Sequence, residues 1–181
     1  NMDSKYDFLY IIAGAGLEYY LKYFMQKAQP LVKKGKILFA GYQREESLLR
    51  YLNAADLFIS TSSSEGGPVS IMEAFACELP VFSTKTGNTA ELMEEHNAGC
   101  LVGTKNYKEW EEKLSQILET RQLPKILDRN IAKEHYDWPI IADKFINIYR
   151  EASPKGTNNS TIKIINILFA TPDQYSEHLD K

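Results

Sequence analysis

Two glutamates, Glu65 and Glu73, stand on either side of a Gly-Gly-Pro turn in the stretch STSSSEGGPVSIME, residues 60–73. A short apolar run ending at Ile59 precedes this stretch, and a helical pattern follows it. Such a run is typical of a buried parallel strand, so we expect the small polar residues to form a loop at its carboxyl end. Open α/β sheets bind their ligands at that edge. The stretch is therefore a candidate ligand site.

The turn itself favours a phosphate group. Gly66 and Gly67 allow a ligand to approach the backbone closely, and Pro68 suits the first position of a helix. The amides of Val69 and Ser70 would then lack partners inside the helix and would attract an anion. Carboxylates are poor neighbours for phosphate but good acceptors for sugar hydroxyls. The residues together indicate a ligand with both phosphate and polyol groups.

A purely structural interpretation of the same residues stays open at this point. Gly-Gly-Pro is also an ordinary strand-to-helix turn, and glutamate is common near the start of a helix because of the helix dipole.

Length and composition limit the class of protein. A chain of 181 residues suits one domain, and 44% hydrophobic with 25% charged residues is ordinary for a globular protein. The net charge of -3 argues against a nucleic-acid partner. No apolar run approaches the ~20 residues that span a bilayer, and no signal peptide is visible. We expect a cytoplasmic protein in which Cys77 and Cys100 are free thiols.

Strand and helix patterns alternate along the chain, which predicts an α/β fold with a doubly wound parallel sheet and extra C-terminal helices. The expected strands are Phe8–Ala13, Ile37–Ala40, Leu57–Ser60, Val81–Ser83 and Leu101–Val102. The expected helices are Leu17–Val32, Glu45–Ala54, Val69–Cys77, Thr89–Glu95, Tyr107–Glu119, Leu123–His135 and Pro139–Ala152. In the first of these helices Tyr19, Tyr20, Tyr23 and Phe24 recur at helical spacing, and we expect them in the core or on a covered face.

The segment SSSEGGPVSIMEAFACELPVFSTKTGNTAEL resembles the signature of glycosyltransferase family 4 (group 1), whose members are retaining enzymes of GT-B architecture with a Glu-x7-Glu motif. The runs IIAGAG, ILFAGY and LLRYLNAADLF before it, and AGCLV after it, follow the family's order. The resemblance covers residues 8–152. It implies that residues 1–152 form the Rossmann-like C-terminal domain that binds a nucleotide sugar.

By this resemblance Glu65 is the catalytic residue and contacts the hydroxyls of the transferred sugar, while Glu73 contacts the ribose. Tyr42, directly after a strand, would lie near the nucleobase. The implied donor is a UDP- or GDP-sugar, with no metal and no other cofactor. His96, His135 and His178 also lack metal-ligand spacing. The donor-binding residues implied in full are Gly14, Gly41, Tyr42, Leu48, Ser64, Gly66, Gly67, Pro68, Val69, Ser70 and Glu73.

The chain departs from the family's pattern in three ways. Glu78 and Asn88 stand where the family often has glycine, which puts the local backbone geometry in question. Gly67 replaces a common bulky residue and would widen the site. An acceptor-binding domain, and an Arg and a Lys that pair with the donor's phosphates, would precede Asn1 in a family member. We therefore expect a donor-binding half that alone binds nucleotide weakly and transfers little sugar, within an enzyme that touches the membrane surface.

Residues 153–160, SPKGTNNS, have the composition of a linker, and residues 161–181 contain a further strand pattern, Ile162–Ala170. Without the family's first strand the sheet would present an open slot. Lys163–Phe169 is a candidate to fill it, within the chain or by strand exchange in a dimer. The alternative is that this segment begins another domain.

Two other functions remain alternatives. One is a non-catalytic nucleotide-binding or interaction module of the same fold, and the other is an epimerase or phosphorylase of GT-B type.

Overall fold

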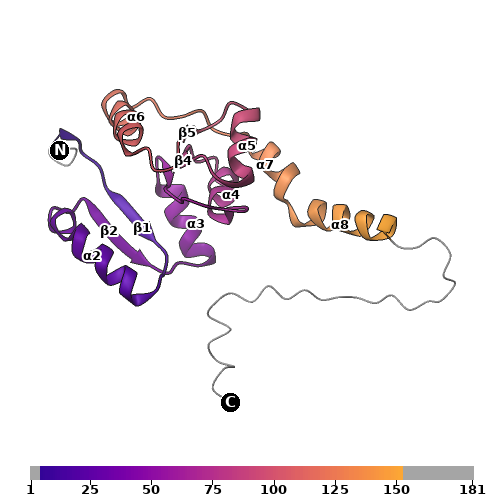
Figure 1. The fold of residues 1–181 in the computed structure, drawn as a ribbon, viewed down its shortest axis with the longest axis horizontal. Coiled ribbons are helices and arrows are strands. Elements are labelled where there is room, and N and C mark those ends of the chain that lie inside the picture. The colour runs from indigo at the N-terminus through magenta and orange to yellow at the C-terminus, as the bar shows by residue number, and fades with distance from the viewer. Residues whose placement is uncertain (1–4, 153–181) are drawn as a thin grey trace, which may run out of the picture. The chain divides into compact units, whose positions relative to one another are not determined.

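The computed structural model describes residues 5–152, apart from the side chain of Thr89. The chain divides into two compact units, Asn1–Asp143 and Lys144–Lys181. The elements in chain order are β1 (Tyr10–Ala13), α2 (Glu18–Lys33), β2 (Ile37–Gly41), α3 (Glu45–Ala54), β3 (Phe58–Ser60), α4 (Val69–Ala76), β4 (Val81–Thr84), α5 (Gly87–Glu95), β5 (Cys100–Val102), α6 (Tyr107–Thr120), α7 (Arg129–Tyr136) and α8 (Trp138–Ala152) (Figure 1). The predicted linker and the segment with Lys163–Phe169 lie outside the described residues.

All strand pairs among the described residues are parallel, as predicted for an α/β fold, but they form two ladders rather than one sheet. β1 pairs with β2, and β4 lies between β3 and β5. Every strand but β4 therefore has one edge without a partner among the described strands.

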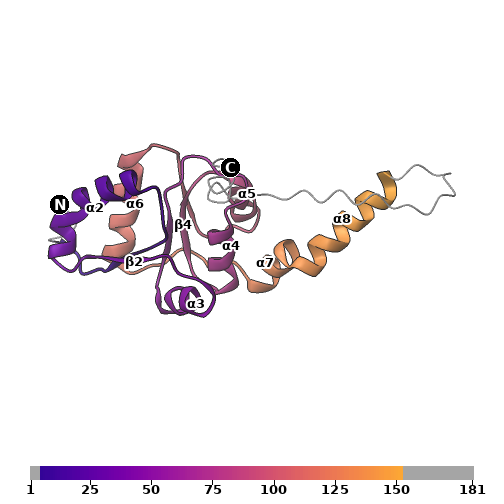
Figure 2. The same cartoon turned by 90° about the horizontal axis from the view of Figure 1, so that it is seen from below.

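The hydrophobic core lies around β4, whose four residues are all buried. Ile71, Ala74 and Phe75 come from one face of α4, as expected for apolar residues three and four positions apart. Helix α7 packs against α4, so the two lie side by side (Figure 2). Phe82 of β4 is fully buried, with its ring centroid 4.1 Å from that of Trp110 in α6. The core thus holds β3 and α4 in place, the two elements that flank the candidate loop of residues 61–68.

One predicted helix was wrong in extent. The expected helix Leu123–His135 begins only at Arg129, and residues 123–128 are not helical. Asp128 then caps α7 by accepting a hydrogen bond from the amide of Asn130 at 2.8 Å. A side-chain cap at this point fixes the true start of the helix.

The aromatic residues of α2 are more exposed than predicted. Phe24 reaches Phe39 of β2 with ring centroids 5.7 Å apart, yet Tyr19, Tyr20 and Tyr23 are 77%, 66% and 57% exposed. The expectation that these tyrosines are covered is therefore wrong for the described part of the chain. Ala28, at 6%, is the buried residue of this helix.

None of the helices in the described part of the chain has the length and apolar character needed to cross a bilayer. Cys77 and Cys100 are both free and half-buried, and burial raises the pKa of each thiol.

Candidate functional site

The candidate loop connects β3 to α4 at the carboxyl end of the strand, as predicted. β3 ends at Ser60 and α4 begins at Val69. Pro68 is the residue before the helix rather than its first residue, with φ -69° and ψ 104°. Its carbonyl accepts hydrogen bonds from the amides of Ile71 and Met72, at 3.1 and 3.3 Å. The helix therefore begins at Val69, as the helical pattern predicts, but Pro68 caps it from outside instead of forming its first residue.

The amides of Val69 and Ser70 occupy the first two helical positions. Neither donates a hydrogen bond to any acceptor within residues 5–152, and no side chain caps this helix. Both residues are exposed, with Val69 at 65%. Two amide donors therefore face outward at the positive end of a helix dipole, an arrangement that suits an anion.

The loop is held in place from the turn between β4 and α5. Gly87 has a φ of +66°, and a Cβ atom there would lie 3.0 Å from the carbonyl oxygen of Glu65. The amide of Asn88 donates to the carbonyl of Gly66 at 3.4 Å, and the hydroxyl of Thr84 donates to the carbonyl of Ser62. This packing makes Gly87 a positioning residue for the loop. The sequence pattern places Gly87 at a turn but does not identify its contact with Glu65.

Gly66 and Gly67 leave space beside the backbone because they lack side chains, and neither is needed for an unusual backbone conformation. Neither has a positive φ. A Cβ atom at Gly66 would meet nothing within 4 Å, and one at Gly67 would make only ordinary contacts, 3.5 Å from Asn88 and 3.6 Å from Met72. The backbone at Gly66 is therefore open to a ligand.

Glu73 lies in the second turn of α4 and is half-buried. Burial raises the pKa of its carboxyl group, and no hydrogen bond or ion pair in the described chain satisfies the carboxylate. A desolvated carboxylate without a partner is destabilising unless a ligand supplies hydrogen-bond donors. Glu65 is also half-buried, next to Gly87, and no hydrogen bond within residues 5–152 joins the two glutamates.

A second group of predicted residues lies at the ends of β1 and β2. The amide of Gly14 donates to the carbonyl of Gly41 at 2.8 Å, which ties the two strand ends together. Tyr42 is 62% exposed, and its hydroxyl accepts a hydrogen bond at 2.9 Å from Nε of Arg44. The guanidinium group of Arg44 also lies 4.9 Å from the centre of the tyrosine ring. Arg44 is absent from the predicted site, although a cation two residues after Tyr42 is visible in the sequence.

The remaining predicted residues divide between the core and the surface. Leu48 packs against the hydrophobic core, and Pro68 is buried. Ser64 is exposed in the loop. The structure therefore places Leu48 against the core and not beside the exposed amides of Val69 and Ser70.

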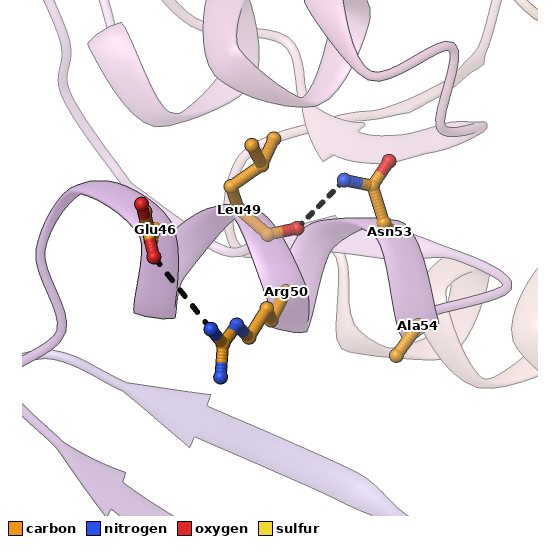
Figure 3. Close-up of a pocket in the computed structure, with 5 residues that line it drawn as sticks. All are labelled: Glu46, Leu49, Arg50, Asn53 and Ala54. Carbon is orange, nitrogen blue, oxygen red and sulfur yellow. Dashed lines mark hydrogen bonds and ion pairs between the residues drawn. The ribbon is translucent and has the colours of Figure 1, made fainter.

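A hollow of about 550 Å³ runs along α3, but it is not the predicted site (Figure 3). Its lining comes from a single helix and includes an ion pair between Arg50 and Glu46 at 3.6 Å. Asn53 donates to the carbonyl of Leu49 at 2.9 Å (Figure 3). None of the predicted donor-binding residues lines this hollow. One open helix face encloses too little of a small molecule to form a binding pocket.

In the part of the chain that the structure describes, no three His, Cys, Asp or Glu side chains gather closely enough to hold a metal ion.

Relatives in sequence support a transferase family. The N,N'-diacetylbacillosaminyl-diphospho-undecaprenol alpha-1,3-N-acetylgalactosaminyltransferase of Campylobacter jejuni is 30% identical over 120 residues, covering 65% of this chain and 31% of that protein. A probable sucrose-phosphate synthase of Thermosipho melanesiensis is 32% identical over 118 residues, covering 64% and 27%. The chain thus spans about a third of the length of these relatives.

Solved structures share the fold. The Anabaena protein HepE in complex with UDP has a TM-score of 0.66 and 24% identity, over 80% of this chain and 41% of that one. HepE has also been solved with UDP-glucose, again with a TM-score of 0.66 and 24% identity, over 79% and 41%. The sucrose-phosphate synthase of Thermosynechococcus elongatus has a TM-score of 0.67 and 20% identity, over 78% and 38%. These likenesses establish a Rossmann-like fold of the GT-B type.

The sequence profile of the family described as "Glycosyl transferases group 1" matches residues 1–134, well over half of the chain. Together with the Glu-x7-Glu loop at the carboxyl end of β3, this match shows that the chain belongs to the group 1 glycosyltransferases.

Proposed function

We propose that this chain is the donor-binding half of a retaining glycosyltransferase that transfers a hexose from a UDP- or GDP-sugar to a glycan or lipid acceptor. Family membership supports the transferase chemistry. The complexes of HepE with UDP and UDP-glucose support the class of donor. The acceptor would bind to a part of the enzyme outside this chain.

One observation carries the proposal: the first two residues of α4, Val69 and Ser70, and its Glu73 all present groups that could bind a ligand. The two amides and the carboxylate have no hydrogen-bond partner among the described residues. The amides suit a diphosphate because helix starts bind anions. The carboxylate suits hydroxyl donors because it is acceptor-only when ionised. A nucleoside diphosphate sugar supplies both kinds of group in one ligand.

In the reaction, the bond between the sugar's anomeric carbon and the diphosphate breaks, and the acceptor oxygen bonds to that carbon on the same face. The acceptor hydroxyl gives up its proton to the leaving diphosphate. Negative charge develops on the leaving diphosphate. The two amides of α4 are fixed in position before the reaction, so they stabilise this charge without reorganisation. Glu65 would orient the sugar through its hydroxyls, and Glu73 would hold the ribose.

Titration calorimetry with UDP, GDP, ADP and their glucose conjugates tests the proposal. We expect one nucleoside diphosphate to bind, and its sugar conjugate to bind more tightly. Glu73→Ala should weaken binding by about 1.5–3 kcal/mol, the value of one charge-assisted hydrogen bond. Glu112→Ala removes an exposed glutamate of α6 and should leave binding unchanged. Failure of every nucleotide to bind would instead favour a non-catalytic module of the same fold.

A further inference from the structure

The turn between β4 and α5 places a side-chain amide beside the candidate loop. Asn88 is the second residue of α5. A Cβ atom at Gly67 would lie 3.5 Å from Oδ1 of Asn88 and 3.8 Å from its Nδ2, so the carboxamide lies against the backbone of Gly67. The family often has glycine at position 88 and a bulky residue at position 67. A carboxamide against an exposed glycine backbone therefore departs from the family's pattern at both positions.

The backbone around this carboxamide is held in place, but its polar atoms are unpaired. The main-chain amide of Asn88 donates to the carbonyl of Gly66 at 3.4 Å, and Gly87 packs against Glu65. Oδ1 and Nδ2 of Asn88 form no hydrogen bond with the residues that the structure describes, and Asn88 is exposed. A ligand bound at the loop would therefore meet an N–H donor that the described chain does not use.

A diphosphate needs more hydrogen-bond donors than the two amides at the start of α4 supply, because each phosphate has several acceptor oxygens. Glu65 cannot provide one, since an ionised carboxylate only accepts. Lys85 lies in the same turn as Asn88, but its ammonium group forms an ion pair with Glu94 at 2.6 Å. The unpaired Nδ2 of Asn88 is thus a donor of the kind that the anion site lacks.

The position of Asn88 indicates which phosphate it would contact. Under the proposed function, Glu65 contacts the sugar and the amide of Val69 contacts the diphosphate. Gly67 lies midway between these two residues in the sequence. Because the carboxamide of Asn88 lies against Gly67, it would face the phosphate that carries the sugar rather than the phosphate next to the ribose.

We propose that Nδ2 of Asn88 donates a hydrogen bond to the sugar-bearing phosphate of the donor. It acts as a third donor to the diphosphate, besides the amides of Val69 and Ser70, and stabilises the negative charge that the diphosphate carries when it leaves. The hydrogen bond is charge-assisted, because its acceptor is ionised. This inference rests on the proposed function, since it concerns the same donor.

Titration calorimetry with UMP, UDP and UDP-glucose tests the inference, and GMP, GDP and GDP-mannose extend the test to guanosine nucleotides. Asn88→Ala keeps the main-chain amide that holds Gly66 and removes the side-chain donor. It should weaken binding of the diphosphate and of its sugar conjugate about 10-fold, the low end for one hydrogen bond to a charged group, and leave binding of the monophosphate unchanged. Asn88→Asp places acceptor oxygens and a negative charge in the same space, so it should weaken diphosphate binding further.

The matched control is Asn53→Ala, which removes an exposed carboxamide from α3. This variant should bind every nucleotide like the unaltered protein. Equal diphosphate affinity in the Asn88→Ala and Asn53→Ala variants would overturn the inference. An equal loss for the monophosphate and the diphosphate, or a loss confined to the sugar conjugate, would also overturn it, because Asn88 would then lie beside the nucleoside or the sugar. If the unaltered protein binds none of these nucleotides, the proposed function fails and this inference fails with it.

Discussion

Replacing Val69 by proline removes a single amide hydrogen from the start of α4 and leaves the carbonyl groups in place. Proline is favoured at the first position of a helix, where the lost donor has no intrahelical partner. The preceding residue, Pro68, already has the extended backbone that a following proline requires, with ψ 104°. The side chain of Val69 is 65% exposed, so its replacement removes little packing. The substitution therefore tests the amide without disturbing the helix.

If the Val69 amide donates to the diphosphate, its loss removes one hydrogen bond to a charged group. Such a bond is worth about 1.5–3 kcal/mol, so the dissociation constant of the nucleoside diphosphate should rise about 10- to 150-fold. Calorimetric titration measures this change, and thermal unfolding measures stability, which should stay within about 0.5 kcal/mol of the parent protein. Val69→Ala keeps the amide and serves as the control. Equal nucleotide affinity in the proline and alanine variants would refute the role of this amide.

The other predictions concern the residues around the loop. Gly87→Ala should destabilise the protein by about 2 kcal/mol in denaturant titrations and weaken donor binding, because its φ is +66° and its Cβ would lie 3.0 Å from the Glu65 carbonyl. Gly66→Ala should leave stability unchanged but weaken donor binding, because its Cβ would point into the open space where we expect the ligand. Normal donor binding by this variant would place the ligand elsewhere. Glu73→Gln should stabilise the protein at pH 7, because burial raises the pKa of the folded carboxyl group and disfavours its ionised form. The gain should disappear near pH 4, where the carboxyl group is protonated. Unfolding curves of the variant that shift equally at both pH values would contradict this. Glu78→Gly should raise the free energy of unfolding by up to about 1 kcal/mol in denaturant titrations, because Glu78 has a φ of 54° that glycine adopts freely. A loss of stability would show that the ion pair between Glu78 and Arg129 contributes more than the backbone strain costs.

Much of the fold could be predicted from the sequence because the signals are local. The apolar run before Ser60 predicts β3, and the Gly-Gly-Pro turn predicts the start of α4 within one residue. The helix expected from Leu123 fails because the periodic pattern continues through Pro124, and only the cap at Asp128 marks the true start of α7. Periodicity describes which residues share a face but not where a backbone hydrogen bond is lost.

The parts of the site that sequence alone does not predict depend on contacts between distant segments. The packing of Gly87 against Glu65 joins two loops that follow different strands of one ladder. The stacking of Arg44 on Tyr42 depends on how α3 leaves β2. The burial that raises the pKa of Glu73 comes from tertiary packing. The division of the strands into two ladders likewise concerns pairing, which a strand's own residues do not specify.

The amide NMR spectrum of the protein during titration with its nucleoside diphosphate sugar tests the location of the donor site most directly. We predict that the resonances of Gly66, Val69 and Ser70 shift as the ligand binds, with those of Gly87 and Asn88 following through the loop contact, while the amides of α6 stay in place. Shifts gathered along α3 beside the hollow at Arg50, with those three amides unmoved, would contradict a donor site at the start of α4.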